Sequence, residues 1–288
     1  MLALALLVYL LIDQGWAEIG AAVRQIDGWR FGLAILLVGI SRLAVAGRWQ
    51  VLIQSAGTGI RVAQSIQITF AGLFAANFLP TTIGGDVVRL AWVIRLGCDR
   101  AVSVASLVAD RLVGMAGMAM ALPFGLPSTM HYFQAANHPA SIPNWLALPW
   151  LRPLQTKVTN FTRRTLQVLQ LWMSKPKALL LALAFTWVHM LCTFGIVWLM
   201  LGGMGEQISF WLVMGLWSAA YFVTLLPISI NGMGVQELAM TFFYTTLGGI
   251  SAPNGLTLAL LMRLIQMLAS LPGALFLPQI LAGRRQVE

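Results

Sequence analysis

Two short stretches place charged residues beside helix-breaking prolines and glycines in otherwise apolar surroundings. The first is FLPTTIGGDVVRL at residues 78–90, and the second is LLPISINGMGVQEL at residues 225–238. Asp86 and Arg89 lie three residues apart, so they share one face of a helix. A helix that begins at the Gly-Gly pair directs its N-terminal amides toward the break, where an anion can bind. The first stretch therefore predicts an anion-binding site.

A purely structural role for the same two residues stays open. Asp86 can cap the helix that follows the break and pair with Arg89 without any ligand. We favour a functional role, because a charged residue within a membrane segment costs roughly 3 kcal/mol on insertion scales and often marks a transport pathway.

The second stretch repeats the first with one charge reversed. When one residue is inserted at Asn231, Arg89 aligns with Glu237. Glu237 can pair with Arg89 or Arg263 across the interface of the two repeats. Such a pair is either a fixed structural contact or part of substrate or proton coupling.

Further charged residues extend this cluster toward the helices that follow each break. Arg111 follows Asp110 directly, so we expect it to face away from its neighbour and to serve packing or snorkelling as an alternative to binding. The predicted substrate-binding residues are Asp86, Arg89, Asp110, Arg111, Asn231, Glu237 and Arg263. The predicted hairpin breaks are Asn77, Pro80, Gly84, Gly85, Pro227, Gly232 and Gly234.

The composition indicates that these residues lie in a membrane. Of 288 residues, 59% are hydrophobic and 9% are charged, and the mean hydropathy is +0.81; soluble domains carry about 25% charged residues. Segments 178–201 and 256–277 stay apolar over the roughly 20 residues that a helix needs to cross about 30 Å of hydrocarbon. We expect an all-α, polytopic integral membrane protein with about seven or eight membrane helices.

The net charge of +9 is best explained by orientation. Basic loops are retained in the cytoplasm, and the basic residues are scattered rather than clustered, which argues against nucleic-acid binding. We therefore expect a multi-pass protein of the cell inner membrane, with segment 152–177 and the C-terminus in the cytoplasm. Contact of the basic segment with anionic lipid headgroups is a second explanation.

Metal and cofactor chemistry finds little support in the sequence. Cys98 and Cys192 form no disulfide framework, and the three histidines have no metal-ligand spacing. The glycines lack the strand and helix context of a nucleotide-binding loop. We expect no metal, no cofactor and no catalytic residue.

The order of segments predicts one transmembrane domain, residues 1–288, made of two inverted repeats. The first half, about 1–125, contains a broken hairpin at 62–97, and the second, about 178–288, contains one at 208–247. Each hairpin precedes a helix with a stripe of polar and small residues, and the hairpins enter from opposite sides. An uncharged connection, 112–151, and a basic segment, 152–177, separate the halves; whether 127–150 holds a membrane span stays open. In transporters with such repeats, substrates bind at interrupted helices near the midplane.

These motifs resemble a known family. NFLPTTIGGDVVRL, ASLVADRLVG at 105–114, LLPISINGMGVQEL and the closing helix with Arg263 are similar to the flippase-like membrane region of lysylphosphatidylglycerol synthase. The resemblance covers nearly the whole chain and implies moving or presenting lipids across a membrane. It carries over the site and break residues named above. Segment 123–149 departs from it with prolines where a clean span is usual. Since no aminoacyl-transferase domain follows Glu288, lipid aminoacylation is not expected.

We therefore expect a flippase-like transporter that binds an anionic or phosphate-bearing membrane lipid between the two broken hairpins. Arg89, Arg111 and Arg263 would hold the phosphate. The carboxylates of Asp86, Asp110 and Glu237 would tune the site or couple it to protons. Two alternatives stay open. One is a membrane enzyme acting on a lipid-linked substrate, with Asp86 or Glu237 as acid or base. The other is a non-catalytic subunit of a membrane complex, or a homo-oligomer.

Overall fold

The structure is a bundle of apolar helices. The computed structural model describes residues 16–78, 84–125, 172, 174–225 and 234–276. Over these residues all regular structure is helical and no strand is present, which confirms the all-α prediction. A short helix, α2 (Trp16–Arg24), precedes the first long helix.

Four helical segments are long and apolar enough to cross a membrane. They are α3 (Gly28–Ser55), α6 (Arg100–Ala121) continued by η1 (Leu122–Gly125), α9 (Pro176–Gly203), and α12 (Ala252–Ser270) continued by η5 (Leu271–Leu275). Their lengths, 28, 26, 28 and 24 residues, exceed the roughly 20 that a span requires. The protein is thus a multi-pass membrane protein. The predicted total of seven or eight membrane helices depends also on segments 1–15 and 126–171, outside the described residues.

Two pairs of shorter helices form the predicted broken hairpins. The first pair is α4 (Val62–Ala76) and α5 (Gly84–Arg95), and the second is α10 (Phe210–Thr224) and α11 (Val235–Thr246). In each pair the first helix has 15 residues and the second has 12. The tips between them include the predicted breaks Pro80, Pro227 and Gly232 and the predicted site residue Asn231, which lie outside the described residues.

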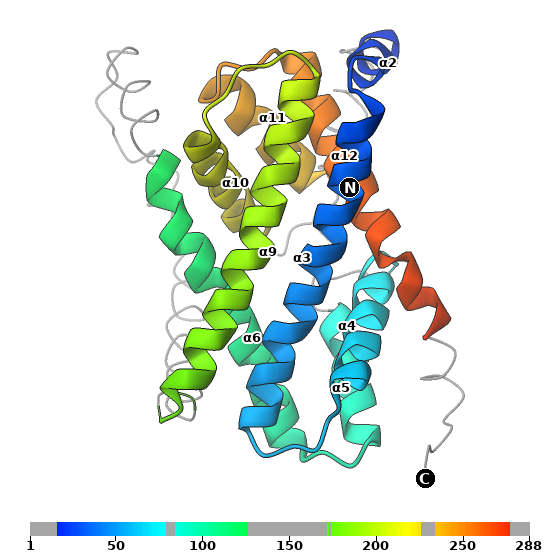
Figure 1. Ribbon diagram of the computed structural model, residues 1–288, viewed down its shortest axis with the longest axis vertical. Coiled ribbons are helices and arrows are strands. Elements are labelled where there is room, and N and C mark those ends of the chain that lie inside the picture. The colour runs from blue at the N-terminus through cyan, green and yellow to red at the C-terminus, as the bar shows by residue number, and fades with distance from the viewer. Residues whose placement is uncertain (1–15, 79–83, 126–171, 173, 226–233, 277–288) are drawn as a thin grey trace, which may run out of the picture.

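The elements recur in the order long, short, short, long. Helices α3 and α9 run antiparallel and form the most extensive helix pair in the bundle (Figure 1). The α4–α5 hairpin lies at the end of the molecule where α3 ends, and the α10–α11 hairpin lies at the end where α9 ends (Figure 1). The two hairpins thus lie at opposite ends of the described bundle, and the inverted repeat stays a prediction.

The polar and small stripe of α6 faces the protein interior, as its spacing predicts. Ser103, Ser106 and Asp110 are buried. A Cβ atom at Gly117 would lie 2.6 Å from Thr186 on α9, so the glycine permits close packing of the two helices. The stripe therefore places the carboxylate of Asp110 inside the bundle, between neighbouring helices and away from lipid.

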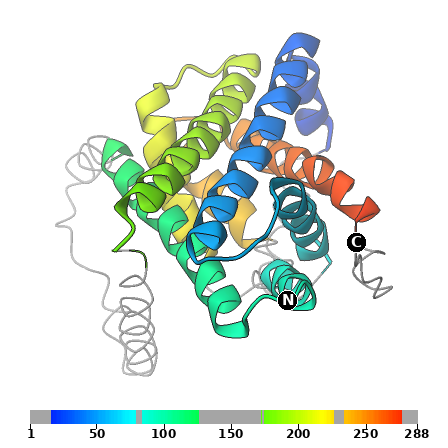
Figure 2. The ribbon, with the colours of Figure 1, turned by 60° about the horizontal axis from the view of Figure 1, so that its bottom comes forward.

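One end of the bundle collects basic residues on its loops and helix ends. We call this the basic end; it comprises Arg61, Arg95, Arg100, Lys175 and Lys177, which lie where α4, α6 and α9 begin and α5 ends. Figure 2 brings this end forward. The loops 56–61 and 96–99 line a common surface pocket there. Under the positive-inside rule this end is expected to face the cytoplasm.

The close approach of α4 and α5 generates a testable prediction. A Cβ atom at Gly85 would lie 2.5 Å from the carbonyl oxygen of Gly72, which is backbone and cannot move aside alone. We expect Gly85→Ala to lower the free energy of unfolding by about 1–3 kcal/mol through overpacking, measured by thermal unfolding in detergent.

The matched control is Gly39→Ala, where an added Cβ meets nothing within 4 Å in the described structure. Since alanine is the better helix former by about 1 kcal/mol, Gly39→Ala should keep or raise the melting temperature. Equal melting of Gly85→Ala and the wild type would contradict the close packing of the hairpin.

Candidate functional site

A buried ionic cluster joins the first hairpin to two long helices. Asp110 on α6 is 2% exposed and lies between two arginines. Its Oδ1 accepts a hydrogen bond of 2.6 Å from Nε of Arg48 on α3. Its Oδ2 accepts bonds of 3.1 and 3.2 Å from the two terminal nitrogens of Arg89 on α5. Two guanidinium groups thus share one carboxylate, and three helices meet there.

Aromatic and hydroxyl groups fix the position of Arg89. Its guanidinium carbon lies 4.6 Å from the ring centroid of Trp49, a cation–π contact. The indole Nε1 of Trp49 in turn donates to Oγ of Ser106, 3.3 Å away. Because the ring is itself anchored to α6, Arg89 is held by both an ion pair and a stacked face.

Asp86 and Arg111 complete the ionic cluster. Asp86, in the first turn of α5, accepts a bond of 3.1 Å from Arg89 and a second one from Nε of Arg111. The pairing of Asp86 with Arg89 agrees with the structural alternative from the sequence. Arg111 is 39% exposed in its side chain, yet it also reaches across to the first hairpin. Arg111 therefore belongs to the cluster as well as to the helix surface. Its position beside Asp110 in the sequence did not indicate this bond to Asp86.

The second hairpin has an ion pair of its own. Oε1 of Glu237 on α11 accepts a bond of 2.6 Å from Nε of Arg263 on α12, and Oε2 accepts one of 2.7 Å from the backbone N–H of Gly234. Arg263 is one of the two partners expected for Glu237. The other, Arg89, instead bonds to the carboxylates of the first cluster, and the described residues contain no ion pair between Arg89 and Glu237.

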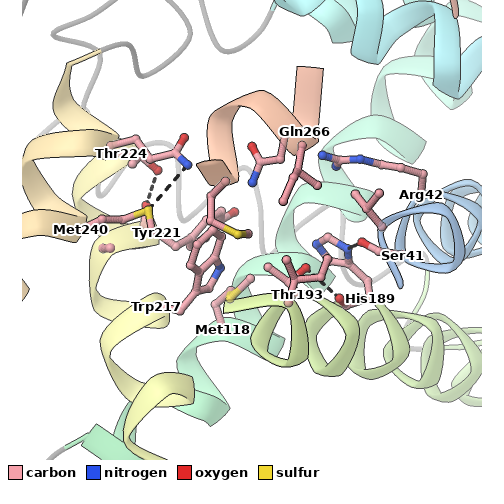
Figure 3. A pocket seen from close by; sticks show the side chains of 16 residues that line it. Ser41, Arg42, Met118, His189, Thr193, Trp217, Tyr221, Thr224, Met240 and Gln266 are labelled. Atoms are coloured by element: carbon pink, nitrogen blue, oxygen red, sulfur yellow. Dashed lines mark hydrogen bonds between the residues drawn. The ribbon is translucent and has the colours of Figure 1, made fainter. Parts of the chain in front are cut away.

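A pocket of about 240 Å³ lies between the long helices and the second hairpin. It is lined from α3, α6, α9, α10, α11 and α12, with no described residue of α4 or α5, so it lies beside one hairpin rather than between two. Figure 3 shows its polar side chains directed inward among aromatic and methionine residues. The polar lining residues are Ser41, Arg42, His189, Thr193, Tyr221, Thr224, Gln236 and Gln266.

Arg42 is the functional candidate that the sequence analysis missed. Its guanidinium extends toward the carboxamide of Gln266 across the pocket (Figure 3). Within the described residues no carboxylate lies within 4 Å of it, and its Nε is buried without a hydrogen-bond partner. By contrast, Arg48, Arg89, Arg111 and Arg263 each pair with a carboxylate.

Uncharged polar groups line the pocket near Arg42. The hydroxyl of Ser41 lies 2.6 Å from Nδ1 of His189, within hydrogen-bond distance. Thr193 donates to the carbonyl of His189 at 2.9 Å. The two glutamines on α11 and α12 add amide donors at the pocket wall. A cation with several neutral donors around it suits an anion with more than one oxygen atom.

A comparison with known protein families identifies the family of this chain. The family model for the lysylphosphatidylglycerol synthase TM region matches residues 1–273. The chain belongs to this family. The resemblance seen in the motifs is thereby confirmed, and membership indicates a role connected with membrane lipids. None of the curated proteins compared with the chain matches it.

In this member of the lysylphosphatidylglycerol synthase TM family, most of the predicted site residues form ion pairs with one another. The structure joins Asp86, Arg89, Asp110 and Arg111 in one cluster and Glu237 with Arg263 in another. Substrate binding by these residues stays a prediction. Among the described residues, no group of three or more His, Cys, Asp or Glu side chains is placed to hold a metal ion.

The shared carboxylate of the first cluster generates a stability prediction. Asp110→Asn removes the negative charge and leaves Arg48 and Arg89 buried with less compensation. Breaking a buried pair by removing one partner typically costs about 3–5 kcal/mol. We expect a loss of this size in the free energy of unfolding, measured by denaturant titration in detergent micelles.

The control is Asp27→Asn, because Asp27 pairs with Arg30 at 3.5 Å but its side chain is 61% exposed. An exposed pair contributes about 0–1 kcal/mol. If the two variants lose equal stability, the cluster around Asp110 does not hold the helices together.

Proposed function

We propose that this protein binds the anionic, phosphate-bearing headgroup of a membrane lipid in the pocket at Arg42 and carries that headgroup across the bilayer. The single observation that carries the proposal is the charge of Arg42, which no described carboxylate within 4 Å neutralises. A buried charge without a partner is costly. An incoming anion would relieve that cost, so the pocket favours negative ligands.

The chemistry of the pocket wall supports a phosphate rather than a carboxylate alone. Arginine offers a planar set of donors that matches two phosphate oxygens. Gln266, toward which Arg42 points, and Gln236 offer further donors for the remaining oxygens. Trp217 and Met240 provide apolar surface for the carbon atoms of a headgroup.

The position of the pocket supports movement as well as binding. Thr224 and Gln236, which line it, flank the tip of the second hairpin at residues 226–233. Arg42 and Arg48 lie on the same helix, about 9 Å apart along its axis at 1.5 Å per residue. The first ionic cluster therefore lies less than two helical turns from the pocket along α3. Broken helices around a substrate site are the usual elements of alternating access.

An enzymatic role receives less support from the geometry. Asp86 and Glu237, the residues suggested as acid or base, both form ion pairs with arginines. Neither carboxylate lines the pocket at Arg42, so neither is placed to act on a headgroup bound there. Mass spectrometry of the lipids in the transport assay would reveal covalent products if the protein were an enzyme.

Arg42→Gln tests the proposal. In proteoliposomes with a fluorescent phosphatidylglycerol, we expect this variant to reduce headgroup movement at least about tenfold, because one charge-assisted hydrogen bond contributes roughly 1.5–3 kcal/mol and 1.4 kcal/mol corresponds to a factor of ten. The measurement is the rate at which a membrane-impermeant reductant gains access to the labelled lipid.

Arg100→Gln serves as the matched control, since Arg100 is an exposed arginine at the basic end and does not line the pocket. It should keep the wild-type rate. Equal rates for Arg42→Gln and the wild type, with both proteins folded, would overturn the proposed function.

A further inference from the structure

A second pocket, of about 550 Å³, lies at the opposite end of the bundle from the basic end. It is formed where α3 begins and α9 ends, together with the loop that leads into α10. It shares no lining residue with the pocket at Arg42. We call it the outer-end pocket; it is lined by Trp29, Arg30, Trp198, Leu199, Gly202, Glu206, Gln207, Ile208 and Ser209.

Arg30 places a fixed positive charge in this pocket. Its Nη1 donates to the carbonyl of Leu199 at 3.2 Å, and its guanidinium carbon lies 5.3 Å from the ring centroid of Trp29. Its Nε lies 3.5 Å from Oδ2 of the exposed Asp27, an ion pair without a hydrogen bond, and no other hydrogen-bond partner of this buried atom is present in the described structure. A Cβ atom at Gly202 would lie 3.2 Å from Nη1, so the glycine gives the guanidinium room.

Glu206 places a negative charge in the same pocket. Its Oε1 accepts three hydrogen bonds, from the backbone N–H and the hydroxyl of Ser251 and from the amide of Asn254, at 2.8–3.1 Å. Partial burial raises the pKa of Glu206, but these hydrogen bonds outweigh that effect and hold the pKa below its usual value. The carboxylate is therefore ionised at neutral pH, and within the described residues its Oε2 has no hydrogen-bond partner.

Two tryptophans complete the pocket and suit it to a lipid interface. Trp29 is 60% exposed and Trp198 is 46% exposed. The indole N–H of Trp198 donates to the carbonyl of Ile208 at 3.1 Å, which fixes the ring beside the loop of Glu206. Tryptophans concentrate at the membrane–water interface, and an indole face attracts an ammonium group.

From these contacts we infer that the outer-end pocket binds the headgroup of an amine-bearing zwitterionic phospholipid. Arg30 takes the phosphate, and Glu206 and the indole of Trp198 take the ammonium group. The pocket carries both charges, whereas the pocket at Arg42 carries a cation alone, so the two sites differ in the ligand that they favour. The inference does not rest on the proposed transport function. The exposed indoles favour a membrane lipid over a soluble phosphoamine.

The test uses the full-length protein in detergent and native mass spectrometry with phosphatidylethanolamine and phosphatidylglycerol of identical acyl chains. Because phosphatidylglycerol is also the probe for the pocket at Arg42, the comparison is made in an Arg42→Gln background. There we expect phosphatidylethanolamine to bind about tenfold more tightly than phosphatidylglycerol, since a charge-assisted contact contributes a factor of this order. Glu206→Gln keeps an oxygen for the bonds from Ser251 and Asn254 but removes the charge, so this preference should disappear. Arg30→Gln should weaken binding of both lipids. Arg30→Lys, which keeps the positive charge, should weaken it less, and this variant can be compared with wild-type Arg30 if Arg30→Gln does not fold.

Arg24→Gln is the matched control, because Arg24 is an exposed arginine near the same end that does not line the pocket. In the same Arg42→Gln background it should retain the preference, and that background separates this site from the proposed transport site. A preference that persists in Glu206→Gln, or that Arg24→Gln also abolishes, would overturn the inference. Full displacement of the lipid by soluble phosphoethanolamine at equal concentration would overturn the assignment to a lipid.

Discussion

The structure depends on the neutralisation of charges that lie inside an apolar bundle. A single ionised side chain in such surroundings is costly, and the cost falls when an opposite charge and further hydrogen bonds satisfy it. Each half of the chain meets this constraint in the same place, between the second helix of the hairpin and the long helix that follows. In the first half Arg89 of α5 meets Asp110 of α6, and in the second half Glu237 of α11 meets Arg263 of α12.

The reversed polarity of these two pairs gives the halves different electrostatic surroundings. Asp110 is shared by two arginines, so the first cluster holds three arginines and two aspartates. Glu237 meets one arginine and the N-terminal amide of its own helix. A positive excess therefore remains near the first hairpin. Arg42 adds to this excess of positive charge farther along α3.

The positions of the helices could be predicted from the sequence because the membrane imposes simple rules. The expected hairpins 62–97 and 208–247 begin and end within two residues of the helix pairs α4–α5 and α10–α11. Proline and glycine mark the ends of these helices, and the length of an apolar run marks the spans. The inward face of α6 followed from the spacing of its serines, Asp110 and glycines. These features are local, so one sequence suffices to find them.

The pairing of charges could not be predicted in the same way, because it depends on distances between helices that sequence spacing does not contain. Glu237 had two arginines as possible partners, and both were compatible with the repeat. Arg42 was missed for a related reason: a lone arginine in an apolar span is explained equally well by a side chain that snorkels to the interface. Arg42 stands out only when the arginines of the two ionic clusters are seen to pair with carboxylates, while no described carboxylate lies within 4 Å of Arg42. The absence of such a partner also matters for transport, since a protein carboxylate at Arg42 would have to be displaced by each incoming phosphate. Under the proposed function, with no such competitor among the described residues, a headgroup would bind and leave without breaking an ion pair that holds the helices together.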